Sequence, residues 1–354
     1  MRHIVCKFGG SSTANAAHLE KILTIVRASP ARRFIVLSAP GTDPAHDDKV
    51  TDMLQDCWEN RHIPHALDLA VSRVEWRFSE LYRGLSVPEP VGETRREILN
   101  AVSISLPHTL SMGEYLCARL FSRTSGMTFV DAAKVIATDD RGDVDEALTA
   151  RNFQRLLQRD ERIVIPGFYG SDRHGRIHTF QRNGSDISGA LAAAGSGAGL
   201  YENWTDVDGL LTADPAIVPE ARLIPQISYR QMRAISRAGA KVLHPDSLDP
   251  VAMSGIPTRL RNTLNPDCFG TLIDEHTHKD VPCIVGKPDS SLPKPLSGQA
   301  ARISVFGITP RRVTDAAKVL EPLCLREKQN AVEVYVPETR YADTLRRLHA
   351  ALIG

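Results

Sequence analysis

Several features that would place a protein in a special class are missing from this chain of 354 residues. No apolar run approaches the roughly 20 residues that cross a bilayer as a helix. The start of the sequence, MRHIVCKFGG, resembles neither a signal peptide nor a spanning segment. The formal net charge is +1, which gives no attraction to nucleic acid or to an anionic membrane. We therefore expect no membrane partner and no nucleic-acid partner.

Patterns typical of disulfide scaffolds and zinc sites are also missing. The six cysteines are scattered without a CxxC pair, and the twelve histidines include no HExxH pattern. A chain of this length can bury a sufficient core without disulfides. We therefore expect reduced thiols in a cytoplasmic protein, and no zinc site.

The sequence does contain a regular alternation of apolar strands and helical patterns. Strands are expected at HIVCKF, FIVLSA, MTFVDA, RIVIPGF, LYENWTD and PTRLRNT. Helices are expected at 17–28, within 49–126, at 146–158, after Asp186 and at 228–238. GSDRHGRIHTF is typical of a β-hairpin. This order predicts an α/β protein whose mostly parallel sheet lies between helices, a three-layer arrangement.

A change of composition divides the chain. GKPDSSLPKPLSGQ, residues 286–299, is rich in Pro, Ser, Gly and Lys and is typical of a linker. It separates a large domain, residues 1–285, from a small α+β module, residues 300–354. In that module we expect strands at 302–307 and 331–336 and find no obvious last strand.

The first motif that could carry chemistry is KFGGSS. A strand that ends in a lysine and leads through Gly9 and Gly10 to Ser11 at a helix start can hold a phosphate on backbone N–H groups. It is not a Walker A loop, because Lys7 precedes the glycines. A tight turn followed by a serine N-cap explains the motif equally well.

Two further segments offer groups for a small substrate. The loop SAPGTDPAHDDKVTD follows the second strand, and its Ser38 and Thr51 could donate to a carboxylate or a phosphate. Turn and capping chemistry is the alternative. Glu114, in SMGEYL, is either a helix-dipole partner or a ligand for an ammonium group.

The stretch TFQRNGSD leads into a helix of small residues. Its Arg182 is suited to a carboxylate, and its Asp186 could orient Lys7 or a metal ion. Ser185 or Asp186 could instead only cap the helix. Downstream, NWTDVDGLLTADP and GAKVLHP contain further candidate nucleotide ligands, namely Thr205, Asp206 and Lys241.

Together these motifs are far more specific than any one of them. KFGGSS, LSAPG with KVTD, GEYL, IPGFYGSD, TFxRxGSD, ENWTDVDGLLTADP, GAKVLHP and RNTxNPxxxGTLI occur in this order. In them the chain resembles the aspartokinases of the amino-acid kinase family over roughly residues 2–275. The C-terminal module resembles an ACT regulatory domain.

The resemblance implies an amino-acid kinase fold and transfer of the γ-phosphoryl group of ATP to the β-carboxylate of L-aspartate, the first step of the aspartate-family amino-acid pathway. Lys7 and Asp186 would serve the transfer, and Gly9, Gly10 and Ser11 the phosphates. The substrate side would comprise Ser38, Thr51, Glu114, Arg182 and Ser185, and the nucleotide side Thr205, Asp206 and Lys241. Mg²⁺ would be held mainly by the ATP phosphates, with Asp186 nearby.

The chain departs from the family pattern in three positions and in its C-terminus. Asn183 replaces a usual glycine, Gln181 a usual small residue, and Ala216 a usual arginine that would meet phosphates. The family usually carries two ACT units, whereas about one incomplete unit is expected here, so feedback inhibition by lysine or threonine is expected to be lost or remodelled. We expect this unit to pair in a homodimer.

Two other functions stay open at this point. Gln181, Asn183 and the shortened module favour an acyl-phosphate kinase for a modified amino acid or a related carboxylate. Ala216 favours a catalytically weak homologue that acts as a binding or regulatory subunit.

Overall fold

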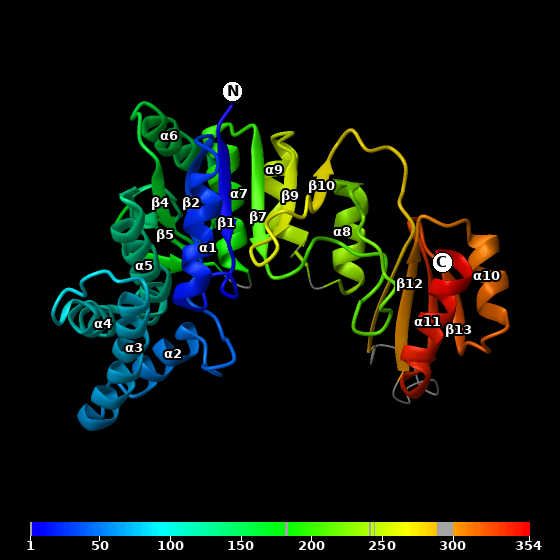
Figure 1. Cartoon of the computed structure of the whole chain (residues 1–354), viewed down its shortest axis with the longest axis horizontal. Coiled ribbons are helices and arrows are strands. Elements are labelled where there is room, and N and C mark those ends of the chain that lie inside the picture. Colours follow the sequence, from blue (N-terminus) through cyan, green and yellow to red (C-terminus); the bar gives the residue numbers. More distant parts are fainter. Residues whose placement is uncertain (1, 181–182, 241, 244, 289–299) are drawn as a thin grey trace. The chain divides into compact units, whose positions relative to one another are not determined.

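The computed structural model describes residues 2–180, 183–240, 242–243, 245–288 and 300–354 (Figure 1). The chain forms two compact units. The first contains Met1–Asp206 and Asp249–Cys268, and the second contains Val207–Leu248 and Phe269–Gly354.

The first unit alternates strands and helices as the sequence predicts. Its strands are β1 (Ile4–Phe8), β2 (Arg32–Leu37), β3 (Thr128–Phe129), β4 (Ile163–Pro166), β5 (Tyr169–Ser171), β6 (Ile177–Thr179), β7 (Leu200–Thr205) and β9 (Thr258–Asn262). Its helices are α1 (Ala16–Arg27), α2 (Val50–Glu59), α3 (Pro64–Gly84), α4 (Glu93–Ile104), α5 (Leu106–Ser125), η1 (Ala132–Lys134), α6 (Glu146–Leu157), α7 (Gly184–Ser196) and α9 (Asp249–Met253).

A parallel sheet with the strand order β3-β4-β2-β1-β7-β9 forms the centre of this unit. Successive residues of a strand face opposite sides of the sheet. In β1, Cys6 and Phe8 pack into the apolar cluster that includes buried residues of α1 to α5. Lys7 faces the other side, where its Cβ lies against α7. Helices therefore cover both faces, and the predicted three-layer α/β architecture is confirmed.

Helix α7 lies close to the sheet because its sequence, GSDISGALAAAGS, contains small side chains. A methyl group at Gly189 would lie 2.5 Å from the hydroxyl of Tyr201 and 2.8 Å from the Cβ of Lys7. Only glycine allows this approach, because the methyl would overlap both strands. The polar first turn of α7 is thereby held above β1 and β7.

The side chains of β7 divide between two environments. Glu202 accepts a hydrogen bond from Arg32 Nε at 2.8 Å on the face turned away from α7. Burial disfavours the charged form of Glu202, but the hydrogen bonds and charge of Arg32 outweigh it and lower the pKa. Trp204 lies on the same face and stacks on Phe8. On the α7 face, the hydroxyl of Tyr201 donates to the backbone carbonyl of Asp186 at 3.3 Å.

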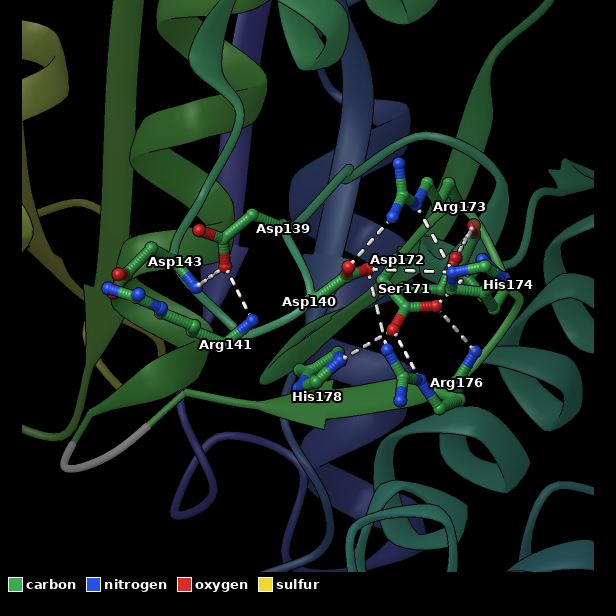
Figure 2. A network of polar contacts seen from close by, with 11 residues as sticks. Asp139, Asp140, Arg141, Asp143, Ser171, Asp172, Arg173, His174, Arg176 and His178 are labelled. Atoms are coloured by element: carbon green, nitrogen blue, oxygen red, sulfur yellow. Dashed lines mark hydrogen bonds and ion pairs between the residues drawn. The ribbon is translucent and has the colours of Figure 1, made fainter.

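The hairpin of β5 and β6 precedes α7 and is fixed by a network of charged groups (Figure 2). One oxygen of the Asp172 carboxylate, Oδ1, accepts hydrogen bonds from the backbone N–H groups of His174 and Arg176. The other oxygen, Oδ2, accepts from Arg176 Nε at 2.6 Å and lies 3.2 Å from His178 Nε2. Burial alone would raise the pKa of Asp172, but these contacts hold it far below its usual range. Asp140 pairs with Arg176 from the neighbouring loop at 3.4 Å. These acidic groups therefore serve to fix the hairpin.

The second unit contains a short parallel pair and a four-stranded antiparallel sheet. Its strands are β8 (Gln226–Ser228), β10 (Thr271–Asp274), β11 (Cys283–Pro288), β12 (Ala300–Phe306), β13 (Cys324–Glu327) and β14 (Ala331–Pro337). Its helices are α8 (Tyr229–Ala238), η2 (Pro245–Leu248), α10 (Pro310–Lys318), η3 (Glu338–Arg340) and α11 (Tyr341–Leu352). The antiparallel sheet has the order β11-β12-β14-β13, and its apolar core includes residues of α10 and α11. The expected α+β module is present.

One boundary differs from the sequence expectation. Residues 286–288, expected at the start of the linker, end strand β11 and pair with β12. The small sheet therefore gains a strand that precedes the linker, and it has four strands instead of the two expected at 302–307 and 331–336. Gly, Lys and Pro suggest a loop locally, and only the non-local pairing makes this segment a strand. Residues 289–299 lie outside the described part of the chain.

None of the helices within the described ranges is both long enough and apolar enough to cross a bilayer.

Replacement of Gly189 by alanine tests the packing of α7. We expect Gly189→Ala to lower the free energy of unfolding by about 1–3 kcal/mol, because the methyl forces α7 away from β1 and β7. Urea denaturation measures this change. Gly195→Ala in the same helix is the control, since its methyl would lie 3.1 Å from the Phe153 side chain and 3.2 Å from the Ala150 backbone, tight contacts but longer than those at Gly189. An equal or larger loss in the control would contradict this account of the packing.

Candidate active site

A glycine loop follows β1 at the edge of the sheet where parallel strands end. The N–H of Gly9 donates to the carbonyl of Trp204 at 3.0 Å, and the carbonyl of Gly10 accepts from Gly41 N–H at 2.9 Å. The first bond corrects the expectation that Gly9 offers its N–H to a phosphate, because that donor is already engaged. Among the described residues, the N–H groups of Gly10 and Ser11 have no acceptor. The loop therefore offers donors one residue later than the sequence suggests.

Lys7 and Asp186 form an ion pair beneath this loop. Lys7 Nζ lies 2.6 Å from Asp186 Oδ1, and the two side chains are 9% and 12% exposed. Asp186 lies in the first turn of α7, where the helix dipole favours a carboxylate. The contact that the sequence suggested between these residues is present. Asn203 Nδ2 also donates to Asp186 Oδ1, at 2.8 Å, and this contact was not anticipated from the sequence.

A cavity of about 660 Å³ opens beside the glycine loop. Six of the residues selected from the sequence line it, namely Gly10, Ser11, Ser38, Thr51, Glu114 and Ser185. They come from the segments that follow β1 and β2 and from α2, α5 and α7. Separate motifs of the sequence therefore meet in one cavity within the first unit.

Glu114 is the most unusual group of this cavity. Its side chain lies on α5 and is buried, and Oε2 has no hydrogen-bond partner among the described residues. Burial raises its pKa to about 8, although the N–H of Ala39 and the charge of Lys7 act in the opposite direction. A buried carboxyl without a full set of partners is suited to a cationic group of a ligand.

Asn183 adopts a backbone conformation that glycine would accept easily. Its φ is +58°, in the left-handed region, where asparagine is tolerated better than most residues. Its side chain does not cap α7 and instead lines the cavity. Asn183 therefore has a conformation that glycine would also accept, and it places an amide-bearing residue in the cavity wall.

Arg77 is a site-supporting residue that sequence reasoning missed. This buried arginine of α3 donates to the carbonyls of Ala14 and Gly41 and contacts His46 Nδ1 at 2.9 Å. It thereby joins the glycine loop after β1 to the loop after β2. The signal was its position, because Arg77 shares a helix face with the buried Val74 and Leu81.

The residues expected on the nucleotide side are only partly described. Thr205 ends β7 and Asp206 follows it at the same edge of the sheet, and Thr205 Oγ1 donates to Asp206 Oδ1 at 3.1 Å. Ala216 lies in the second unit, where its N–H donates to Asp214 Oδ1 at 2.9 Å. The third nucleotide candidate, Lys241, lies outside the described residues, as do Gln181 and Arg182 of the substrate side.

Comparisons with curated proteins agree with these motifs. A model described as "Amino acid kinase family" matches residues 2–262. Aspartokinase 3 of Bacillus subtilis (strain 168) is 36% identical over 285 residues, which cover 76% of this chain and 63% of that protein. Lysine-sensitive aspartokinase 3 of Escherichia coli (strain K12) is 29% identical over 297 residues, covering 77% and 64%. The chain thus spans somewhat less than two thirds of the length of these relatives.

Solved structures agree as well. A structure of aspartate kinase from Clostridium acetobutylicum has a TM-score of 0.86 at 27% identity, covering 99% of this chain and 100% of that chain. E. coli aspartokinase III in complex with aspartate and ADP has the same fold, with a TM-score of 0.81 at 21% identity. The predicted amino-acid kinase fold and the resemblance to aspartokinases are confirmed. The chain belongs to the amino-acid kinase family.

Proposed function

We propose that this chain transfers the γ-phosphoryl group of ATP to the β-carboxylate of L-aspartate and forms 4-phospho-L-aspartate, the first step of the aspartate-family pathway. The observation that carries the proposal is the Lys7–Asp186 pair beneath a glycine loop, beside a cavity that contains the unpartnered carboxyl of Glu114. The similarity to proteins named aspartokinase supports it.

On the phosphate side, the chain itself supplies positive charge and backbone donors. Lys7 would turn toward the transferring phosphoryl group, whose transition state depends mainly on positioning and charge neutralisation. The N–H groups of Gly10 and Ser11 would hold its oxygens. Thr205 and Asp206, with Lys241, would serve the nucleotide.

Mg²⁺ would accompany ATP, and Asp186 is the residue of this site that could bind it. No group of three or more His, Cys, Asp or Glu side chains within the described ranges could hold a metal ion. Asp186 has one carboxylate oxygen without a hydrogen bond to any described residue. Mg²⁺ commonly uses one or two carboxylates together with phosphates and water, and it neutralises phosphate charge.

On the acceptor side, charged groups would orient the amino acid. Glu114 would bind the ammonium group and Arg182 the α-carboxylate, while Ser38, Thr51 and Ser185 would complete the pocket. The attacking β-carboxylate is already ionised near neutral pH, since such groups have pKa values of about 4. No general base and no covalent intermediate are therefore required.

The proposal also covers the domain organisation, the oligomeric state and the cellular location of the enzyme. Residues 1–285 would bind both substrates, and the module at residues 300–354 would pair in a homodimer. The pairing would use the small sheet, whose outer strands are β13 and β11, the latter formed by Cys283–Pro288 ahead of that module. A monomer in sedimentation would contradict that pairing. The six free cysteines favour a cytoplasmic protein.

The decisive experiment is hydroxamate formation by the purified chain with Mg-ATP and a panel of carboxylates. We expect L-aspartate to give the highest kcat/KM. Turnover of another carboxylate but not of aspartate would mean that the acceptor is a modified amino acid or a related carboxylate. Asn183 in the cavity wall favours this alternative. Nucleotide binding without any turnover would instead favour a binding subunit.

Arg182→Ala tests the assignment of the α-carboxylate. We expect the KM for aspartate to rise on the order of tenfold to a hundredfold, because a charge-assisted pair is lost, while the KM for ATP stays nearly constant. Arg173→Ala is the matched control, since this arginine is 76% exposed and pairs with Asp140. An unchanged KM for aspartate in Arg182→Ala would exclude this role.

The pH dependence of substrate binding tests Glu114. Because its pKa is about 8, the free enzyme holds this carboxyl largely protonated at neutral pH, and an ammonium group binds the ionised form. The KM for aspartate should fall as the pH rises toward about 8 and then level off. Glu114→Gln should keep a high KM without this dependence.

The same variant has a predicted stability signature. A carboxyl whose pKa is raised on folding reduces stability as the pH rises from its ordinary 4.5 to about 8. Glu114→Gln should lack this decline, which urea denaturation at both ends of the range measures. A decline equal to that of the wild type would show that Glu114 is ionised throughout.

A further inference from the structure

Asn203 occupies a position where an apolar residue would be expected. It lies in the middle of β7, between β1 and β9, and is only 2% exposed. Strand interiors beneath a helix are normally apolar, and a buried amide is costly unless its hydrogen bonds are made. The residue therefore requires an explanation in terms of its partners.

Its partners belong to the ion pair. Asn203 is the direct neighbour of Lys7 across the parallel strands β1 and β7, so both side chains face α7. Lys7 Nζ lies 2.6 Å from Asp186 Oδ1, and Asn203 Nδ2 lies 2.8 Å from the same oxygen. An ionised carboxylate only accepts hydrogen bonds, so the amide must present its nitrogen. One carboxylate oxygen thus has two donors, one charged and one neutral.

A second contact orients the amide. Asn203 Nδ2 also lies 3.3 Å from the hydroxyl of Tyr201, which itself donates to the backbone carbonyl of Asp186 at 3.3 Å. The Tyr201 hydroxyl therefore links the Asn203 amide to the backbone of Asp186. This contact does not depend on where the Lys7 side chain points.

We infer that Asn203 is a positioning residue that shares Asp186 Oδ1 with Lys7 and thereby allows Lys7 to turn toward the transferring phosphoryl group. In a buried site an ion pair without a competing donor is strong, and a carboxylate that loses its donor is poorly satisfied. Asn203 weakens the Lys7–Asp186 contact and keeps Asp186 bonded when Lys7 moves. Its kinetic consequence rests on the proposed function, whereas the competition for Oδ1 does not.

Asn203→Leu removes the donor at similar volume. We expect Lys7 to be held more tightly, so that kcat falls about tenfold while the KM values for aspartate and ATP change less than about twofold. A purely structural role would instead lower stability and change KM together with kcat. That outcome, or an unchanged kcat, would overturn the inference.

The reactivity of Lys7 gives a readout that needs no turnover. Brief labelling of the folded chain with acetic anhydride, followed by peptide mass spectrometry, measures how often the Lys7 amine is free. We expect the labelling rate to fall several-fold in Asn203→Leu, because a neutral competitor for Asp186 is gone. An equal or faster rate would refute the competition even if the wild type phosphorylates no carboxylate.

Two further variants complete the design. Asn203→Ser leaves room for a water that restores a neutral donor, so it should recover part of the kcat and of the labelling rate. If Asn203→Leu does not fold, Asn203→Val replaces it, because valine also lacks a donor and is favoured in strands. Ser196→Ala removes a buried hydroxyl of α7 that contacts His3 and neither member of the ion pair. It should match the wild type in both measurements. Equal losses in Ser196→Ala and Asn203→Leu would contradict a specific role.

Discussion

The ion pair between Lys7 and Asp186 is the interaction on which the proposed chemistry depends. A lysine in the middle of a buried strand is costly unless a partner compensates its charge. Asp186 provides that partner from the first turn of α7, and Gly189 allows the helix to lie close enough for the two groups to meet. The small residues of α7 therefore do more than fill space, because they bring the carboxylate of Asp186 to the Lys7 amine.

The sheet determines which other groups surround this pair. Because β1, β2, β4 and β7 are parallel neighbours, the segments that follow them leave the sheet at one edge. Gly10 and Ser38 reach the cavity in this way. Arg77 then binds carbonyls of two of these loops, so the backbone donors are held in place before a ligand arrives. Donors fixed in advance stabilise developing charge without reorganisation during the reaction.

The sequence predicts the architecture well, because apolar alternation and helical spacing are local signals. It also predicts the Lys7–Asp186 contact, since both residues stand in recognisable motifs. Arg77 and Asn203 could not be assigned in the same way, because their roles depend on residues far away in the chain. The end of strand β11 was missed for the same reason, since the composition of residues 286–288 suggests a linker and only their pairing with β12 makes them part of a strand. The hydrogen bond of the Gly9 N–H likewise depends on a distant segment, because its acceptor is the carbonyl of Trp204 in β7.

Asn183 and Glu114 contribute to the cavity wall in different ways. Asn183 has a left-handed backbone conformation, which glycine also adopts without strain. Asn183 lines the cavity shortly before Ser185 and Asp186, which lie in the first turn of α7. Glu114 still offers an unpartnered carboxyl within the same cavity. In the proposed function, recognition of the ammonium group by Glu114 and selection among acceptors at Asn183 would depend on different residues, so the acceptor preference could shift at Asn183 while Lys7 and Asp186 keep their contact.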